Sequence, residues 1–286
     1  MGEFFSALTD PSVPFIRYAL IAGILSSASF GIIGSFVVVK RISYIAGAIS
    51  HAALAGIGGA LFFGQVYQYT FISPLYGAII AALLSALIIA VVSRRSMERE
   101  DTVIGTIWAV GMAIGLLFIS RTPGYIDPMS YLFGNILLIG KTELYIIVAL
   151  DILVITLSLL FYQQFLSVSF DEEFTRLRGL PTQFYYILLI LLVALTIVLM
   201  VTVVGIVMVI ALLTIPAATA GLFTSTLWRM MILAGIFCAL FTVLGLITSY
   251  IFDLPSGSTT IVFAGAIYLI LSVTAGKLLR ESRGKP

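Results

Sequence analysis

The chain has 286 residues, of which 61% are apolar and 10% are charged, and its formal net charge at pH 7 is +2. Ordinary soluble domains carry about a quarter charged residues, and a soluble chain of this length has no core that holds so much apolar surface. The composition therefore excludes a soluble domain and predicts an all-α protein that crosses a lipid bilayer many times. We expect no disulfide framework, because Cys238 is the only cysteine, and no nucleic-acid partner.

Nine apolar runs are long enough to cross a bilayer, which takes about 20 residues at a rise of about 1.5 Å each. In chain order these runs cover about 14–39, 44–64, 74–93, 102–120, 142–162, 184–200, 203–225, 229–250 and 259–279. The division near Val201–Val203 is the least distinct, and partial or re-entrant runs leave eight or ten spans open. The sequence thus predicts a polytopic helix bundle that forms one domain over residues 1–286.

The positive charges divide unequally between the two sides of this bundle. If the N-terminus is outside and the C-terminus inside, the outer side holds three basic residues and the inner side twelve. The outer ones are Arg17, Arg121 and Lys141. The inner ones are Lys40, Arg41, Arg94, Arg95, Arg99, Arg176, Arg178, Arg229, Lys277, Arg280, Arg283 and Lys285. Because cytoplasmic loops of membrane proteins are enriched in lysine and arginine, we predict this orientation.

A short amphipathic helix is predicted at about 170–179, in the longest inner connection. Acidic residues at 171–173 suit the first turn, Arg178 suits the last turn, and Gly179 suits the C-terminal cap. Phe174 lies on an apolar face with its neighbours at helical spacing, as in a helix parallel to the membrane. The helix either completes the loop or contacts a cytosolic motor.

Two ionisable residues lie well inside the predicted spans. His51 is the only histidine, and an ionisable side chain at membrane depth usually faces a cavity or a partner. Neutral imidazole binds zinc, iron and manganese, which favours an ion path over the alternative of a hydrogen bond between helices. Asp151 is a candidate to complement His51, but it equally suits a hydrogen bond to a hydroxyl or the lining of a wet crevice.

Further candidates are weaker. Pro216 removes a helical hydrogen bond, and Thr214 is placed to satisfy the freed carbonyl; a helix broken at a transport path and a simple packing kink explain this equally. Asp127 and Asp253 belong to the outer side, where acids would concentrate cations at a mouth. Ordinary turn formation explains the same two acids.

Six segments together resemble the permeases of ABC importers for zinc, manganese and iron, whose fold is related to that of vitamin B12 and siderophore permeases. The segments are Ile49–Gly56, Glu100–Gly105, Ser130–Leu137, Asp171–Leu180, Ala211–Ala220 and Asp253–Gly257. The resemblance implies a bacterial cytoplasmic (inner) membrane protein that imports a divalent transition-metal ion. It implies as partners two ABC ATPase subunits, a second permease copy or paralogue, and an extracytoplasmic metal-binding protein.

The resemblance also assigns roles to residues. ATP would be hydrolysed on the separate ATPase subunit, which agrees with the absence of a GxxxxGK[ST] phosphate loop from this chain, so the chain itself is expected to be no enzyme and to bind no cofactor. The residues expected to contact that ATPase are Asp171, Glu172, Phe174, Arg178 and Gly179.

One position departs from the family pattern. Many members carry an aspartate one helical turn before the histidine, where this chain has Gly47. A lone imidazole makes a weak metal site, so the carboxylate comes from elsewhere, the ion passes without tight binding, or the substrate differs. Ser50 lies about 100° around the helix from His51 and is at best a partial substitute. We expect Gly47→Asp to raise metal retention.

Two other functions remain as alternatives: a permease for a metal chelate such as a siderophore or B12-like cargo, and a proton-coupled secondary transporter. Short outer loops favour a bare ion over a chelate, and the small number of intramembrane ionisable residues argues against proton coupling. The sequence leaves open which metal is carried and whether the permease pair is identical.

Overall fold

The computed structural model describes residues 14–69, 73–92, 100–124, 126–134 and 140–283, and the regular elements in these ranges are all helices. Three short helices are α6 (Pro128–Phe133), α8 (Tyr162–Phe170) and α9 (Glu172–Leu177). The long helices are α2 (Pro14–Val39), α3 (Ser43–Val66), α4 (Pro74–Val92), α5 (Glu100–Arg121), α7 (Lys141–Leu160), α10 (Thr182–Val204), α11 (Ile206–Gly221), α12 (Leu227–Phe252) and α13 (Ser256–Arg283).

Eight of the described helices are long and apolar enough to cross a membrane, and α11 is a shorter apolar helix. At a rise of 1.5 Å per residue, the 16 residues of α11 extend about 24 Å, somewhat less than the hydrocarbon thickness. The predicted all-α bundle of eight to ten spans is confirmed, and each of the nine predicted runs overlaps one of these helices.

The turn between α10 and α11 consists of one residue, Gly205, which has a φ of +82°. Side chains are disfavoured at this φ, and a Cβ on Gly205 would lie only 2.6 Å from the carbonyl oxygen of Leu132. Gly134 has a φ of +88° and packs against the backbone of Val204 in the same way. Two glycines thus fix the turn by direct contact of backbones, slightly beyond the division expected near Val201–Val203.

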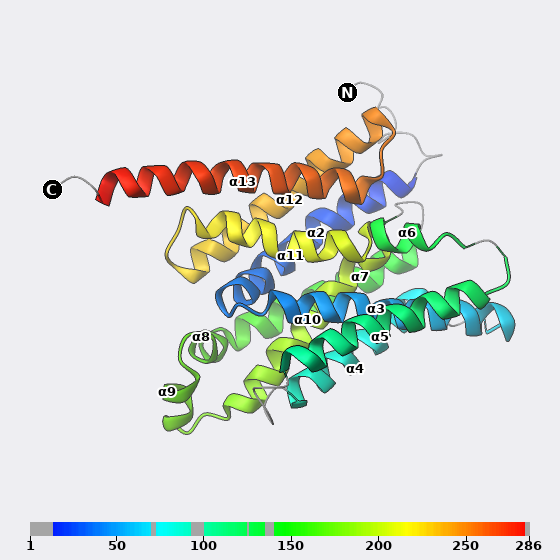
Figure 1. Cartoon of the computed structure of the whole chain (residues 1–286), viewed down its shortest axis with the longest axis horizontal. Coiled ribbons are helices and arrows are strands. Elements are labelled where there is room, and N and C mark those ends of the chain that lie inside the picture. The colour runs from blue at the N-terminus through cyan, green and yellow to red at the C-terminus, as the bar shows by residue number, and fades with distance from the viewer. Residues whose placement is uncertain (1–13, 70–72, 93–99, 125, 135–139, 284–286) are drawn as a thin grey trace.

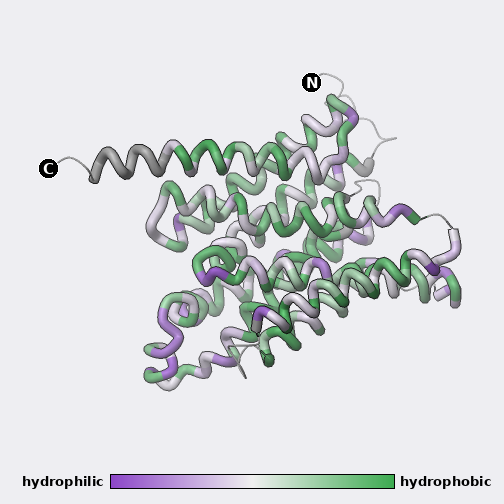
Figure 2. Tube along the Cα trace, in the orientation of Figure 1, coloured by the Kyte–Doolittle hydropathy of each residue, from purple (hydrophilic) through white to green (hydrophobic). Residues whose placement is uncertain are grey.

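The helices run side by side and their connections gather at two ends of the bundle (Figure 1). One end carries α9, the α2–α3 turn and the α11–α12 turn, and we call it the α9 end. The opposite end carries α6, the start of α2 and the α12–α13 turn, and we call it the α6 end. Figure 2 shows hydrophilic residues gathered over α9 and apolar residues along the long helices. The predicted inner residues Arg94, Arg95, Arg99 and Lys285, and positions 135–137 of one family-like segment, lie outside the described residues.

Small residues bring α3 close to its neighbours α4 and α5. A Cβ on Gly56 would overlap the carbonyl oxygen of Gly77 on α4, and a Cβ on Gly111 of α5 would lie 2.6 Å from Cα of Ala52. About two thirds of the apolar stretch of α3 is buried, against 17% for α5. The second span is therefore largely enclosed by other helices, and α3 is the element that positions His51.

Candidate functional site

His51 lies about a third of the way along α3 from the α9 end, and its side chain is partly buried. Its imidazole stacks on the indole ring of Trp108 from α5, with the ring centroids 4.5 Å apart and the planes 18° apart. The Nδ1 atom is buried and has no hydrogen-bond partner among the described residues. The alternative of a hydrogen bond between helices therefore gains no support at Nδ1 from the described residues.

Trp108 also fills the space beside Gly47, one helical turn before His51. A Cβ on Gly47 would lie 2.7 Å from Cζ3 and 3.1 Å from Cη2 of this indole, which is too close for the ring to stay where it is. At the position where many family members carry an aspartate, this chain therefore has a glycine, and a large side chain from α5 occupies the space beside it. The sequence does not reveal this contact, because Gly47 and Trp108 are 61 positions apart and no local pattern links them.

Ser50 is fully buried, and its hydroxyl donates to the carbonyl oxygen of Ala46 at 2.9 Å within α3. This hydrogen bond occupies the hydroxyl proton within the helix. The geometry gives no support to Ser50 as a substitute for the missing carboxylate.

Asp151 lies on α7 and is buried, and its carboxylate accepts a hydrogen bond from the hydroxyl of Ser29 on α2. Helix α7 packs against α2 and α10, whereas α3 packs mainly against α4 and α5. The described residues contain no group of three His, Cys, Asp or Glu side chains that could hold a metal ion. The structure thus places Asp151 with a hydroxyl, which is the alternative that the sequence left open, and its expected contact with the ion gains no geometric support.

Helix α11 continues through Pro216. The carbonyl that loses its partner at a proline is four residues back, here that of Leu212. The hydroxyl of Thr214 donates to the carbonyl oxygen of Ile210 at 2.8 Å, so it does not satisfy that carbonyl as expected. Thr214 lines a cavity of about 380 Å³ near the α2–α3 turn, together with Arg41.

The two acids expected at an outer mouth both form turns at the α6 end. The carboxylate of Asp127 caps α6 by accepting from the backbone N–H of Met129 at 3.0 Å and from the hydroxyl of Ser130 at 3.3 Å. Asp253 ends α12 with a φ of +51° and is exposed. Both acids therefore have a structural role that needs no ion.

The predicted amphipathic helix is present as α9, with bounds narrower than the expected 170–179. The carboxylate of Asp171 caps it by accepting from the backbone N–H of Phe174 at 2.8 Å, and Gly179 follows its end with a φ of +77°. Phe174 is 51% exposed, and the guanidinium of Arg178 lies 4.8 Å from the centroid of its ring. A cavity of about 390 Å³ between α8 and α9 adjoins Phe174. An apolar ring held beside a cation at the end of the bundle is a surface suited to a protein partner.

Lys40 connects this segment to the rest of the bundle, and the sequence analysis missed its role. Its ammonium group donates to the carbonyl oxygen of Val168 on α8 at 2.8 Å, lies 3.8 Å from the carboxylate of Glu172 on α9, and lies 5.3 Å from the ring centroid of Tyr186 on α10. Only two residues separate Lys40 from the start of α3. Lys40 therefore links α8 and α9 to the turn that leads into the helix of His51.

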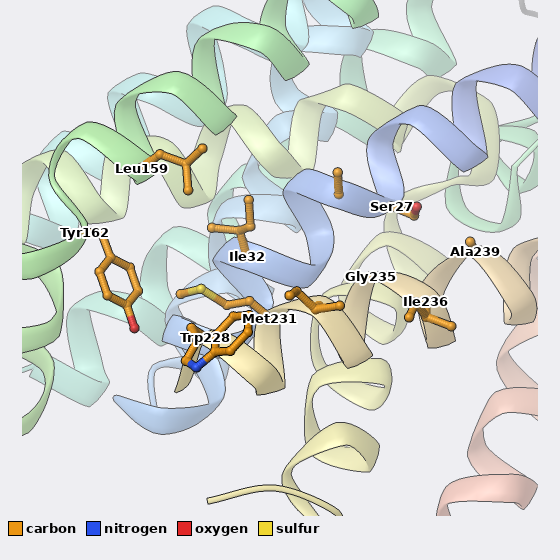
Figure 3. A pocket seen from close by; sticks show the side chains of 11 residues that line it. Ser27, Ile32, Leu159, Tyr162, Trp228, Met231, Gly235, Ile236 and Ala239 are labelled. Carbon is orange, nitrogen blue, oxygen red and sulfur yellow. The ribbon is translucent and has the colours of Figure 1, made fainter. Parts of the chain in front are cut away.

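An apolar cavity of about 550 Å³ lies between α2, α12 and the α7–α8 junction (Figure 3). Ile32, Leu159, Trp228, Met231 and Ile236 are among the side chains that line it. The hydroxyl of Ser27 at this cavity donates to the carbonyl oxygen of Ile24 at 2.6 Å. No carboxylate or imidazole lines the cavity, so it is unsuited to holding a cation and adds nothing to the site at His51.

The model of the family described as "ABC 3 transport family" matches residues 12–275. An uncharacterized membrane protein of Synechocystis sp. is 42% identical over 90% of this chain and 89% of its own length. The manganese transport system membrane protein MntC of Listeria monocytogenes is 36% identical over 92% of this chain and 91% of its own length.

Among solved structures, PsaBC from Streptococcus pneumoniae, in complex with a Fab, contains a chain that superposes on this one with a TM-score of 0.82. The two chains are 32% identical, and the match covers 94% of each.

Proposed function

Because this chain belongs to the ABC 3 transport family, we propose that it is the membrane-spanning subunit of an ATP-driven importer that carries a divalent transition-metal ion into the cytoplasm. The observation that carries this proposal is His51, an imidazole with an unused nitrogen inside a bundle whose relatives include a manganese transport protein. In this proposal the helices around His51 form the route of the ion, and the chain itself catalyses no reaction. Manganese is the first metal to test, with zinc and iron next.

The ion path that we propose runs past His51 on α3. The imidazole contacts the ion transiently, and backbone or hydroxyl oxygens complete its ligands. A single nitrogen ligand gives a weak site, which suits transport because a site on a path has to release its ion as readily as it accepts it.

The proposed motor contact is the α9 surface, formed by Asp171, Glu172, Phe174, Arg178 and Gly179. We propose that an ABC ATPase subunit binds here and that two such subunits serve a pair of permease chains, with an extracytoplasmic metal-binding protein at the α6 end. The exposed ring of Phe174 beside the Arg178 guanidinium supports a protein contact, since aromatic and arginine side chains are enriched at protein interfaces. The α9 end would then be cytoplasmic.

Orientation can be tested by labelling single cysteines from one side of the membrane. The exposed Ser225 lies at the α9 end and the exposed Lys141 lies at the opposite end. In a background that lacks Cys238, Lys141→Cys should react with an impermeant reagent added outside, and Ser225→Cys should react only after the membrane is opened. The reverse pattern would contradict the proposed orientation.

Transport can be tested by reconstituting the chain with its ATPase and its binding protein in liposomes and measuring ATP-dependent uptake of radioactive manganese, zinc and iron. We expect uptake of at least one free ion, and we expect His51→Ala to lower it by at least about 10-fold, because the loss of a mere supporting residue near a metal already costs 10- to 100-fold. Normal uptake by His51→Ala would place the path elsewhere. Uptake of a metal chelate without uptake of a free ion would overturn the proposed cargo.

A further inference from the structure

Three residues of α3 form one stripe along the helix beneath a single aromatic side chain. Tyr44, Gly47 and His51 are spaced at i, i+3 and i+7, which places them on the same face. Trp108 from α5 lies along this stripe. Its ring centroid is 5.7 Å from that of Tyr44 and 4.5 Å from that of His51, and its six-membered ring lies where a Cβ on Gly47 would meet it, at the distances given above.

The stack fixes the plane of the imidazole. A histidine that binds a metal usually donates its second ring N–H to a carboxylate or carbonyl, and this hydrogen bond sets the direction of the ligating lone pair. The described residues offer no such partner to Nδ1 of His51. The indole is the side chain against which the ring is held, and ring stacking of this kind restricts rotation of the imidazole about its side-chain bonds.

The indole also acts electrostatically. The face of an aromatic ring is electron-rich and attracts positive charge within about 6 Å of its centroid, and tryptophan does so most strongly. A cation bound to His51 places positive charge on the imidazole, which is stacked on that face at 4.5 Å. The contact with Trp108 is therefore stronger when the ion is bound than when it is absent.

We propose that Trp108 is a positioning residue of the ion path. It holds the His51 imidazole and favours its cation-bound form, a role that a hydrogen-bonded carboxylate has at other metal sites. Gly47 leaves the space that the indole ring occupies. This inference rests on the proposed role of His51 in transport. It reverses the effect on metal retention that the sequence predicts for Gly47→Asp. Gly47→Asp would displace the indole rather than add a ligand to an intact site, so it should lower metal retention unless Trp108 is shortened as well.

The first test compares substitutions that move or replace the indole. Trp108→Phe keeps an aromatic face and should retain most of the uptake. Trp108→Leu removes that face, and Gly47→Ala pushes the indole away while leaving both rings in the chain. We expect both to raise the KM for Mn²⁺ by about 10- to 100-fold in the reconstituted complex, as loss of a supporting residue does at metal sites, with ATP hydrolysis and complex assembly maintained.

A matched control is available on the same helix. A Cβ on Gly59 would lie 3.9 Å from the ring of Phe118, an ordinary contact, so Gly59→Ala should leave the KM unchanged. A wild-type KM in both Trp108→Leu and Gly47→Ala would overturn the positioning role while leaving the importer itself intact. Normal uptake by His51→Ala would instead overturn the path on which this inference rests.

The second test needs no transport. The sequence contains two tryptophans, so Trp228→Phe leaves Trp108 as the only tryptophan of this chain, and the emission of the same complex that also carries Trp108→Phe is subtracted as background. In the purified complex, Co²⁺ bound at His51 would lie against the indole and quench its emission. We expect saturable quenching that is lost when His51→Ala is added to the Trp228→Phe background. Quenching that persists without His51, or no quenching at any Co²⁺ concentration that supports uptake, would contradict the proposal.

Discussion

The α3–α5 pair and the α8–α9 segment differ in how the size of their side chains matches what surrounds them. Along α3, residues are small because another backbone lies against them, as at Gly56 and Gly58, and their partners belong to this chain. Along α9, the large apolar side chains of Phe174 and Leu177 are 51% and 79% exposed at the end of the bundle where hydrophilic residues gather (Figure 2). The close contacts of the first region lie within the chain, whereas the second leaves apolar side chains exposed, where we propose that the ATPase subunit binds.

This difference predicts that substitution harms the two regions in different ways. At the α3 glycines that touch another backbone, such as Gly56 and Gly58, it should damage folding, and on α9 it should damage coupling while the fold persists. The predictions below are ordered from the largest expected effect to the smallest.

The largest effect is expected from Gly56→Leu, because a Cβ there would overlap the carbonyl oxygen of Gly77 and the two helices would have to separate. Overpacking of this kind costs about 3 kcal/mol. Thermal unfolding in detergent, followed by size-exclusion chromatography, should show a large loss of the monodisperse protein. Leu177→Ala on α9 is the control and should stay within about 0.5 kcal/mol of wild type, since its side chain is exposed. Equal losses in both would erase the distinction between the regions.

The next effect concerns coupling at α9. Phe174→Ala removes the exposed ring that we propose the ATPase subunit binds, and truncation of a central aromatic anchor costs about 2 kcal/mol or more of binding free energy, a factor of about 30. Uptake should fall by this order while the chain unfolds at the wild-type temperature. Pull-down of the ATPase and transport in liposomes measure the two quantities.

Gly179→Pro tests the same surface through the backbone, because proline cannot adopt the φ of +77° found there. It should uncouple ATP hydrolysis from uptake while the protein still reaches the membrane. Full transport with full complex assembly in both α9 variants would contradict a motor contact.

Lys40 lies where the two regions meet, and its loss should have a moderate effect. Lys40→Met removes the hydrogen bond to Val168 and the ion pair with Glu172. The ion pair is partly exposed and therefore contributes little to stability. A hydrogen bond from a charged donor contributes about 1.5–3 kcal/mol, so α9 should be held less firmly and ATP hydrolysed per ion imported should rise several-fold. Arg41→Met, which removes the same charge from the same turn, is the control and should leave this ratio unchanged.

The sequence predicted the helices well and the contacts of the site poorly. Length and hydropathy located the spans, because each span must be long and apolar enough to cross the lipid. The position of α9 followed from the acidic residues at 171–173 and from Gly179, which act locally, although the sequence did not identify Asp171 as the N-cap. Contacts between residues that are far apart in the sequence leave no local pattern of this kind. Trp108 belongs to an apolar run in which any large side chain would be expected, and Lys40 resembles any basic residue that ends a span. The approach of α5 to α3, which brings Trp108 against Gly47 and His51, is visible in the structure and not in the sequence.

The smallest effect on uptake is expected at Asp151, and this substitution separates its two interpretations. Asp151→Asn keeps an oxygen that accepts from the hydroxyl of Ser29 but removes the negative charge that a metal ion would need. If the carboxyl joins α7 to α2, as its hydrogen bond indicates, Asp151→Asn should leave metal uptake within about two-fold of wild type. Asp151→Leu should lower the stability of the bundle by about 1–3 kcal/mol, because the Ser29 hydroxyl then loses its acceptor in a buried place. A fall in uptake by Asp151→Asn as large as that in His51→Ala, with unchanged thermal unfolding, would instead place this carboxylate on the ion path, and α7 would have to approach α3 during transport.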